Sequence, residues 1–284
     1  MNHYIITTES GSDLPKEYVN RFNVEIIPMH VTMGNETLPD GSFEVKRAFD
    51  FYDETGTLPK TSGTTPDDNL KIFSKIHEEH PEAHIIHIGY SAVTTVSFNA
   101  AHIAAEDFEN IHLVDAKHVT LGLSAVVIAT AQFIDENPAV SPEEIVAFVE
   151  EIRERTHMVF IPKTLLYLKA GRRVSNLAFH SANLLKLNPT IVLDDGYLVS
   201  GKKYRGSFER CLNKMLADFF NMRDIDPNTV LVGGAPGVTP EHKETVLNYV
   251  EQQGVLNPVW NGTGAVISSH GGPGAIGIVG IARK

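Results

Sequence analysis

A serine, an aspartate and a histidine occur in this chain in the order that one class of hydrolases uses for acyl transfer. Ser91 lies in the stretch 89–93, Gly-Tyr-Ser-Ala-Val, which departs from the G-x-S-x-G nucleophile elbow at its last position. Asp115 and His270 follow in the Ser–Asp–His order. Val93 replaces the elbow's second glycine, and its β-branched side chain would clash with the turn or relax it. A Ser-dependent esterase or thioesterase using Ser91 and His270 is therefore the alternative hypothesis.

The other hypothesis makes Ser91 a group that holds a ligand. The residue follows an apolar run at 85–88 and precedes a helix that we expect to open at about Ala92. Unpaired backbone N–H groups and the helix dipole favour an anion at such a place. A serine there also serves as a plain helix cap that binds nothing, and the sequence by itself leaves these roles open.

A second hydroxyl-rich stretch, at 60–66, reads Lys-Thr-Ser-Gly-Thr-Thr-Pro. Thr65 is explained as the N-cap of a helix whose first residue is a proline. Thr61 and Ser62 are left over. They are either ordinary loop residues or part of a second anion cradle.

Short apolar runs alternate with helix signals over the first half of the chain. Pro15 and Thr65 mark helix starts, and residues 141–144, Ser-Pro-Glu-Glu, form a capping box sequence. Four apolar runs are typical of buried strands, at residues 4–6, 24–27, 85–88 and 111–114. This alternation predicts a mostly parallel sheet with helices on both faces, in which ligands sit beyond the carboxyl ends of the strands.

The second half has a different pattern. Residues 190–199 contain two apolar runs around Asp-Asp-Gly, the signature of a hairpin. The remaining elements that we expect are helices at 207–221 and from Thr239, and strands at 230–233, 265–268 and 275–281. The chain is therefore predicted to form two α/β domains, residues 1–157 with the mostly parallel sheet and residues 158–284 with a mixed sheet and helices.

Composition excludes several classes of function. The 284 residues carry a net charge of −11, which argues against nucleic acid or an anionic membrane as the main partner. No stretch approaches the roughly 18 uninterrupted apolar residues of a membrane span, so we expect no stable membrane insertion. The single cysteine, Cys211, fits a reducing compartment, and we expect a cytoplasmic protein. The histidine pairs at 77/80 and 84/87 have no matching carboxylate or cysteine set, so no metal site is predicted.

Five short segments, spread over nearly the whole chain, match the motifs of one protein family in the same order. They are residues 8–14, 61–63, 90–94, 167–173 and 270–275. In this order they resemble T-D-S-x-x-D-L, T-S-Q, S-S-x-L-S-G-T, Y-L-x-x-G-G-R and H-x-G-P-G-A of the DegV family. That family of bacterial fatty-acid-binding proteins includes the FakB subunits of fatty-acid kinase. The chain departs from the motifs at four places, with Glu9 for Asp, Thr94-Thr95 for Ser-Gly, Arg172 for Gly, and Asn188 where the family usually has Lys.

The resemblance implies a carrier that has no catalytic residues and no cofactor, with a long-chain fatty acid as its ligand. The acyl chain would lie in a buried tunnel, and the carboxylate would be held by Thr61, Ser62, Ser91 and His270, with Thr94 taking part of the serine's role. Arg173 and Arg205 are assigned to the head-group opening or to a contact with a partner. The implied partner is a separate ATP-dependent kinase that makes the acyl phosphate, because the chain has no G-x-x-x-x-G-K-[ST] loop of its own.

Overall fold

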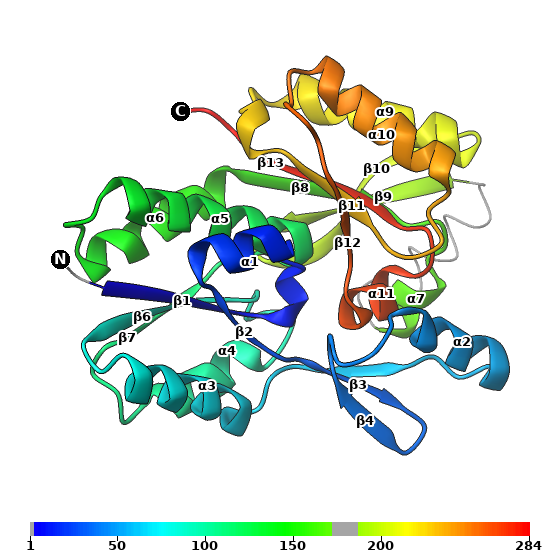
Figure 1. The fold of residues 1–284 in the computed structure, drawn as a ribbon. Helices are drawn as coiled ribbons and strands as arrows, with labels where there is room; N and C mark the ends of the chain where they lie inside the picture. The colour runs from blue at the N-terminus through cyan, green and yellow to red at the C-terminus, as the bar shows by residue number, and fades with distance from the viewer. Residues whose placement is uncertain (1–2, 172–186) are drawn as a thin grey trace.

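The computed structural model describes residues 3–171 and 187–284 and shows two α/β domains with a small third sheet beside them (Figure 1). The first domain holds a four-stranded sheet and the second a six-stranded sheet. Helices α5 (Thr120–Glu136) and α6 (Pro142–Arg155) lie between these two sheets in Figure 1. The two-domain α/β fold predicted from the sequence is confirmed.

The strands of the first sheet all run parallel, in the order β2-β1-β6-β7. They are β1 (His3–Glu9), β2 (Glu25–Ile27), β6 (Ala83–Gly89) and β7 (Ile111–Asp115). One face packs against α3 (Pro66–Glu79) and α4 (Ser97–Ala105), and the other against α5, α6 and the end of α1 (Lys16–Phe22). Because both faces are covered, β6 is buried along almost its whole length.

Local capping fixes the helix starts that the sequence predicted. The Thr65 hydroxyl accepts a hydrogen bond from the Asp68 N–H, and the Ser141 hydroxyl accepts one from the Glu144 N–H. The carboxylate of each partner bonds back to the N-cap backbone, so both sites are complete capping boxes.

The sheet of the second domain is mixed, as predicted, in the order β10-β9-β8-β13-β11-β12. β11 and β12 run parallel, and the other neighbouring strands are antiparallel. The strands are β8 (Thr156–Ile161), β9 (Leu187–Asp194), β10 (Tyr197–Arg205), β11 (Leu231–Gly234), β12 (Trp260–Gly262) and β13 (Ile276–Ile281). Helices α9 (Phe208–Met222) and α10 (Pro240–Gln252) cover the outer face, and α5 packs on the inner one (Figure 1). The short 3-10 helices are η1 (Ser10–Ser12) and η2 (Pro227–Thr229).

A small antiparallel sheet in the first domain was not predicted. It has the order β4-β3-β5, with β3 (His30–Met33), β4 (Glu36–Pro39) and β5 (Lys60–Ser62), and α2 (Lys46–Thr55) follows β4. Thr61 and Ser62 therefore lie in a strand rather than in a loop. In Figure 1 this sheet lies next to α7 (Leu166–Ala170) and α11 (Ala265–Gly271) of the second domain.

Two local predictions were wrong. Residues 265–268, expected as a strand, form helix α11, because carboxylates from the first domain accept hydrogen bonds from its first N–H groups. A short apolar run does not by itself distinguish a buried strand from a buried helix. The helix expected at Ala92 starts at Ser97 instead. The Thr94 N–H and hydroxyl both donate to the Ser91 carbonyl and close a turn at that place.

Candidate ligand-binding site

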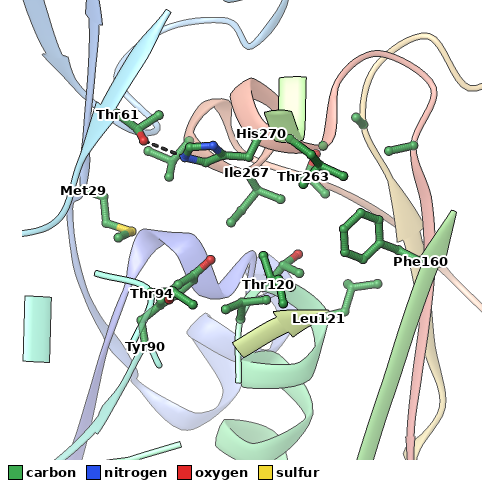
Figure 2. A pocket seen from close by; sticks show the side chains of 18 of the residues that line it. Met29, Thr61, Tyr90, Thr94, Thr120, Leu121, Phe160, Thr263, Ile267 and His270 are labelled. Carbon is green, nitrogen blue, oxygen red and sulfur yellow. Dashed lines mark hydrogen bonds between the residues drawn. The ribbon is translucent and has the colours of Figure 1, made fainter. Parts of the chain in front are cut away.

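A largely apolar cavity of about 280 Å³ lies where the two domains and the small sheet meet (Figure 2). Its larger apolar side chains are Met29, Val96, Val119, Leu121, Met158, Phe160, Leu168, Leu198, Val266, Ile267 and Ile276. Its hydroxyl and imidazole side chains are Thr61, Ser62, Tyr90, Thr94, Thr95, Thr120, Thr263 and His270. In Figure 2, Thr61, His270, Tyr90 and Thr94 lie at the left of the view, and Leu121 and Phe160 lie at the right. The cavity can therefore take an elongated apolar molecule with a polar end.

A hydrogen bond between the two domains marks the polar side of the cavity. Thr61 Oγ1, on β5, lies 2.7 Å from His270 Nε2, in the last turn of α11 (Figure 2). Which of the two atoms donates depends on the histidine tautomer. Gly171, at the end of α7, allows this arrangement, because a Cβ there would lie 2.4 Å from His270 Nδ1. Gly171, in the motif at residues 167–173, thus leaves room for the imidazole.

Helix α11 is held at its other end by two carboxylates of the first domain. Asp13 Oδ1 accepts a 2.6 Å hydrogen bond from the Gly264 N–H, and Asp40 Oδ1 accepts one of 2.8 Å from the Ala265 N–H. The Thr120 hydroxyl also donates to Asp13, at 2.5 Å. Burial raises the pKa of Asp13 to about 8 despite these donors, and burial raises the pKa of Asp40 as well. The two carboxyl groups position the helix that carries His270.

Ser91 does not line the cavity, although its neighbours Tyr90 and Thr94 do. Its fully buried hydroxyl donates a 2.9 Å hydrogen bond to the Gly196 carbonyl, in the β9–β10 turn of the other domain. Gly196 has a φ of +82°, and a Cβ at this position would lie 2.6 Å from Ser91 Oγ. Ser91 therefore connects the two domains, and the structure does not bring it together with His270 at the cavity.

Asp115, the remaining member of the suspected triad, stabilises a loop. Its Oδ1 accepts hydrogen bonds from the Lys117 N–H at 2.8 Å and from the Ala92 N–H at 3.3 Å. The first contact lies directly after β7, and the second ties this segment to the one that follows the neighbouring strand β6. The geometry gives no support to an esterase that combines Ser91, Asp115 and His270.

The two hydroxyl segments approach each other closely at Gly63. A Cβ on this glycine would lie 2.3 Å from Ser97 Oγ and 2.4 Å from Thr95 Oγ1. The hydroxyl groups of the Thr61–Ser62 pair and of Thr94 and Thr95 therefore face one cavity from two directions. Thr95 and Thr120 were not singled out from the sequence, although Thr95 directly follows the serine motif.

Glu9, which stands where the family motif has aspartate, accepts a hydrogen bond from the backbone of a residue that lines the cavity. It is fully buried, and its Oε2 accepts a 2.8 Å hydrogen bond from the Tyr90 N–H. Its Oε1 lies 3.6 Å from Nε2 of the buried His87. The glutamate, which is longer than the aspartate of the motif, thus positions Tyr90.

Of the two arginines that were predicted at the opening, Arg205 and Arg173, the first lies among the described residues. Arg205 is exposed at the end of β10 and does not line the cavity. Arg173 lies outside the described residues.

Within residues 3–171 and 187–284, no cluster of three or more His, Cys, Asp or Glu residues could hold a metal ion. No helix in these same ranges has the length and apolar character needed to cross a membrane.

Known proteins match nearly the whole chain, some in sequence and some in fold. A DegV domain-containing protein of Clostridium acetobutylicum is 28% identical over 292 residues, which cover 98% of this chain and 99% of that protein. A DegV family protein from Thermus thermophilus, described by its fatty acid binding, superposes with a TM-score of 0.86 at 24% identity, covering 99% of this chain and 100% of that one. A DegV family protein from Eubacterium eligens, loaded with heptadecanoic acid, superposes with a TM-score of 0.84 at 17% identity and the same coverage. The model of the family described as "Uncharacterised protein, DegV family" matches residues 3–283, so the chain belongs to the DegV family, as its five motifs predicted.

Proposed function

We propose that this protein binds a long-chain fatty acid in the cavity between its domains, with the carboxylate beside Thr61 and His270. The observation that carries the proposal is the cavity itself, which is mostly apolar and has Thr61, Thr94 and His270 together on one side in Figure 2. The Thermus and Eubacterium proteins of the same fold are described as binding fatty acids, which supports the same ligand class here.

The polar side supplies what a carboxylate needs. A buried carboxylate must receive several hydrogen bonds, or it protonates or does not bind. Thr61, Ser62, Thr94 and Thr95 offer hydroxyl donors, and the imidazole of His270 offers one N–H more. A carboxylate at this place would exchange the hydrogen bond between Thr61 and His270 for bonds to its own oxygens.

The apolar wall supplies most of the affinity. A sixteen-carbon tail is worth on the order of 12 kcal/mol when fully buried, at about 0.8 kcal/mol per CH₂ and before losses. A hydrogen bond to a charged group contributes only about 1.5–3 kcal/mol. The tail therefore dominates binding, while the polar groups select an acid and fix its orientation.

We further propose that the protein is a carrier, which presents the carboxylate to a separate ATP-dependent kinase for acyl-phosphate formation. The chain has no phosphate-binding loop of the G-x-x-x-x-G-K-[ST] type, so a nucleotide would come with the partner. Arg205, exposed at the end of β10, and Arg173 are the candidate contacts for that partner.

One experiment tests the ligand and the absence of a serine nucleophile together. The protein is purified from a bacterial host and denatured, and the extract is analysed by mass spectrometry, with a second sample treated first with a fluorophosphonate probe. We expect about one fatty acid per chain and no adduct on Ser91. Empty protein that takes up neither palmitate nor oleate would refute the carrier, and an adduct on Ser91 would favour the esterase.

A further inference from the structure

We propose that Met158 is a gate between the fatty-acid cavity and a second cavity, and that acyl chains too long for the first pass Met158 into the second. This inference rests on the proposed function, because it concerns the far end of the same ligand. It assigns to Met158 the control of chain length.

The second cavity has a volume of about 360 Å³ and lies at the junction of β8, β9, β10 and α9. Its apolar wall includes Val159, Val192, Leu193, Met215 and Phe219. Met158 also lines it, and is the residue shared by both cavities within the part of the chain that the structure describes. The two spaces thus both border the Met158 side chain.

Strand register places Met158 at the far end of the first cavity. β13 follows α11 and His270, and its Ile276 and Gly277, which line the cavity, pair with Ile161 and Phe160 of β8. Met158 lies two residues beyond Phe160 along β8, and its partner Val279 does not line the cavity. A ligand whose head group lies at His270 and whose tail follows these strands therefore ends at Met158.

The ladder between β8 and β9 ends beside Met158. Within the described residues, the ladder joins Phe160 to Ile191 and Val159 to Val192 and does not continue to Met158 and Leu193. The second cavity is lined by Met158 and Leu193 from the inner face of the sheet, and by Val159 and Val192 from the outer face. It therefore has lining residues from both faces of the sheet, next to the last pair of the β8–β9 ladder.

The side chain at this point suits a gate. Methionine is unbranched, with three rotatable bonds, and changes rotamer more easily than the β-branched residues that dominate this sheet. Met158 is buried, with 5% of its surface exposed, and it borders both cavities, as the proposed gate requires. A tail that displaces it would exchange apolar contacts for apolar contacts.

The second cavity also suits the methyl end of a tail. Three of its polar groups are paired with each other, because Asp218 accepts a 2.6 Å hydrogen bond from the Tyr204 hydroxyl and lies 3.0 Å from Lys202 Nζ. A hydrocarbon entering between them and Met158 would not leave these groups without partners.

The test is a competition between acids of different length. Wild type and variants are incubated with equal amounts of a sixteen-carbon and a twenty-two-carbon saturated acid, and the bound acids are quantified by mass spectrometry. We expect Met158→Ala to raise the ratio of bound long to short acid at least tenfold, since each additional buried CH₂ is worth up to about fourfold in affinity. Met158→Leu, which keeps the volume, should change the ratio less than threefold. Leu256→Ala, at an exposed site that lines neither cavity, is the control for handling.

A second variant shows where the longer tail goes. Val192→Phe narrows the second cavity without adding a side chain to the first, so in the Met158→Ala background it should abolish the gain. An unchanged ratio in Met158→Ala, or a gain that survives Val192→Phe, would overturn the gate. Binding of neither acid by the wild type would instead refute the proposed function, and the gate with it. Melting curves for each variant establish that it is folded.

Discussion

The Asp13 carboxylate accepts a 2.6 Å hydrogen bond from the Gly264 N–H, so a residue of the first domain fixes the start of the helix that carries His270. This contact links the opening motif, which contains Asp13, to the helix whose last turn carries His270, and it gives the aspartate a positioning role. The Asp40 carboxylate repeats it at the next residue, Ala265. The orientation of the imidazole in the cavity thus depends on two buried acidic groups.

The raised pKa of Asp13 predicts a pH dependence of stability. Between its ordinary pKa of 3.8 and its folded pKa of about 8, the native state binds the proton more tightly than the unfolded state does. Stability from this group is therefore fully present below pH 4 and falls as the pH rises toward 8, by at most about 1.4 kcal/mol per pH unit. Asp13→Asn should remove this contribution, so the difference in unfolding free energy between wild type and variant should shift in favour of the variant as the pH rises. Parallel urea titrations from pH 5 to pH 8 measure it, and a constant difference would contradict the assignment.

Removing the Thr61 hydroxyl should weaken binding without disturbing the fold. Thr61→Val keeps the shape and deletes one donor, which is expected to lower the affinity for palmitate roughly tenfold, or about 1.4 kcal/mol. Thr61→Ser keeps the hydroxyl and should stay within about threefold of wild type. Isothermal titration with delipidated protein provides the measurement. Equal affinities for Thr61→Val and wild type would place the carboxylate elsewhere in the cavity.

Ser91→Ala distinguishes the role predicted from the sequence from the one that the geometry favours. A serine that donates to the ligand carboxylate would cost palmitate binding about 1–3 kcal/mol when replaced. Because the hydroxyl instead bonds the Gly196 carbonyl, we expect a loss of roughly 1 kcal/mol of unfolding free energy and little change in affinity. Both quantities are measured on the same preparation. A large loss of affinity with unchanged stability would restore the ligand role.

The two arginines are expected to matter for transfer rather than for retention of the ligand. Arg205→Ala and Arg173→Ala should each retain palmitate nearly as well as wild type, and at least one should lower kinase-coupled acyl-phosphate formation tenfold or more. A guanidinium group can pair with a phosphate or with the partner's surface, which is the role proposed for both residues. Equal loss of binding and transfer in Arg173→Ala would make it a head-group ligand instead. No change in either assay for both variants would remove the arginines from the carrier model.

The elements that were predicted correctly are those whose signals are local. Neighbouring residues determine the capping boxes at Thr65 and Ser141 and the Asp-Gly hairpin turn at 195–196. The strands β1 and β6 are covered on both faces, so each contains a continuous apolar run that can be recognised in the sequence. The small sheet was missed because its strands have only three or four residues, with polar side chains at many of their positions.

The site was predicted in part, and the limits have a physical cause. Thr61, Ser62, Thr94 and His270 were found through motifs, and they do line one cavity. The partner of Ser91 was not accessible to sequence reasoning, because Gly196 lies 105 residues further along the chain. The docking of α11 on Asp13 joins residues 251 apart and converts an expected strand into a helix. Contacts of such separation follow from tertiary packing and leave no local pattern.

Helix α5 has a consequence for how the molecule unfolds. Its buried residues Val126 and Val127 belong to one core that also contains Ile86 of the first sheet and Val279 of the second. Because α5 packs against both sheets, unfolding of either domain would remove apolar contacts that the other domain makes through this helix. Melting of the two domains should therefore be coupled into a single cooperative transition. The amide protons of α5 should then exchange with solvent only through global opening, and cutting the chain near residue 157 should leave two halves that do not fold alone.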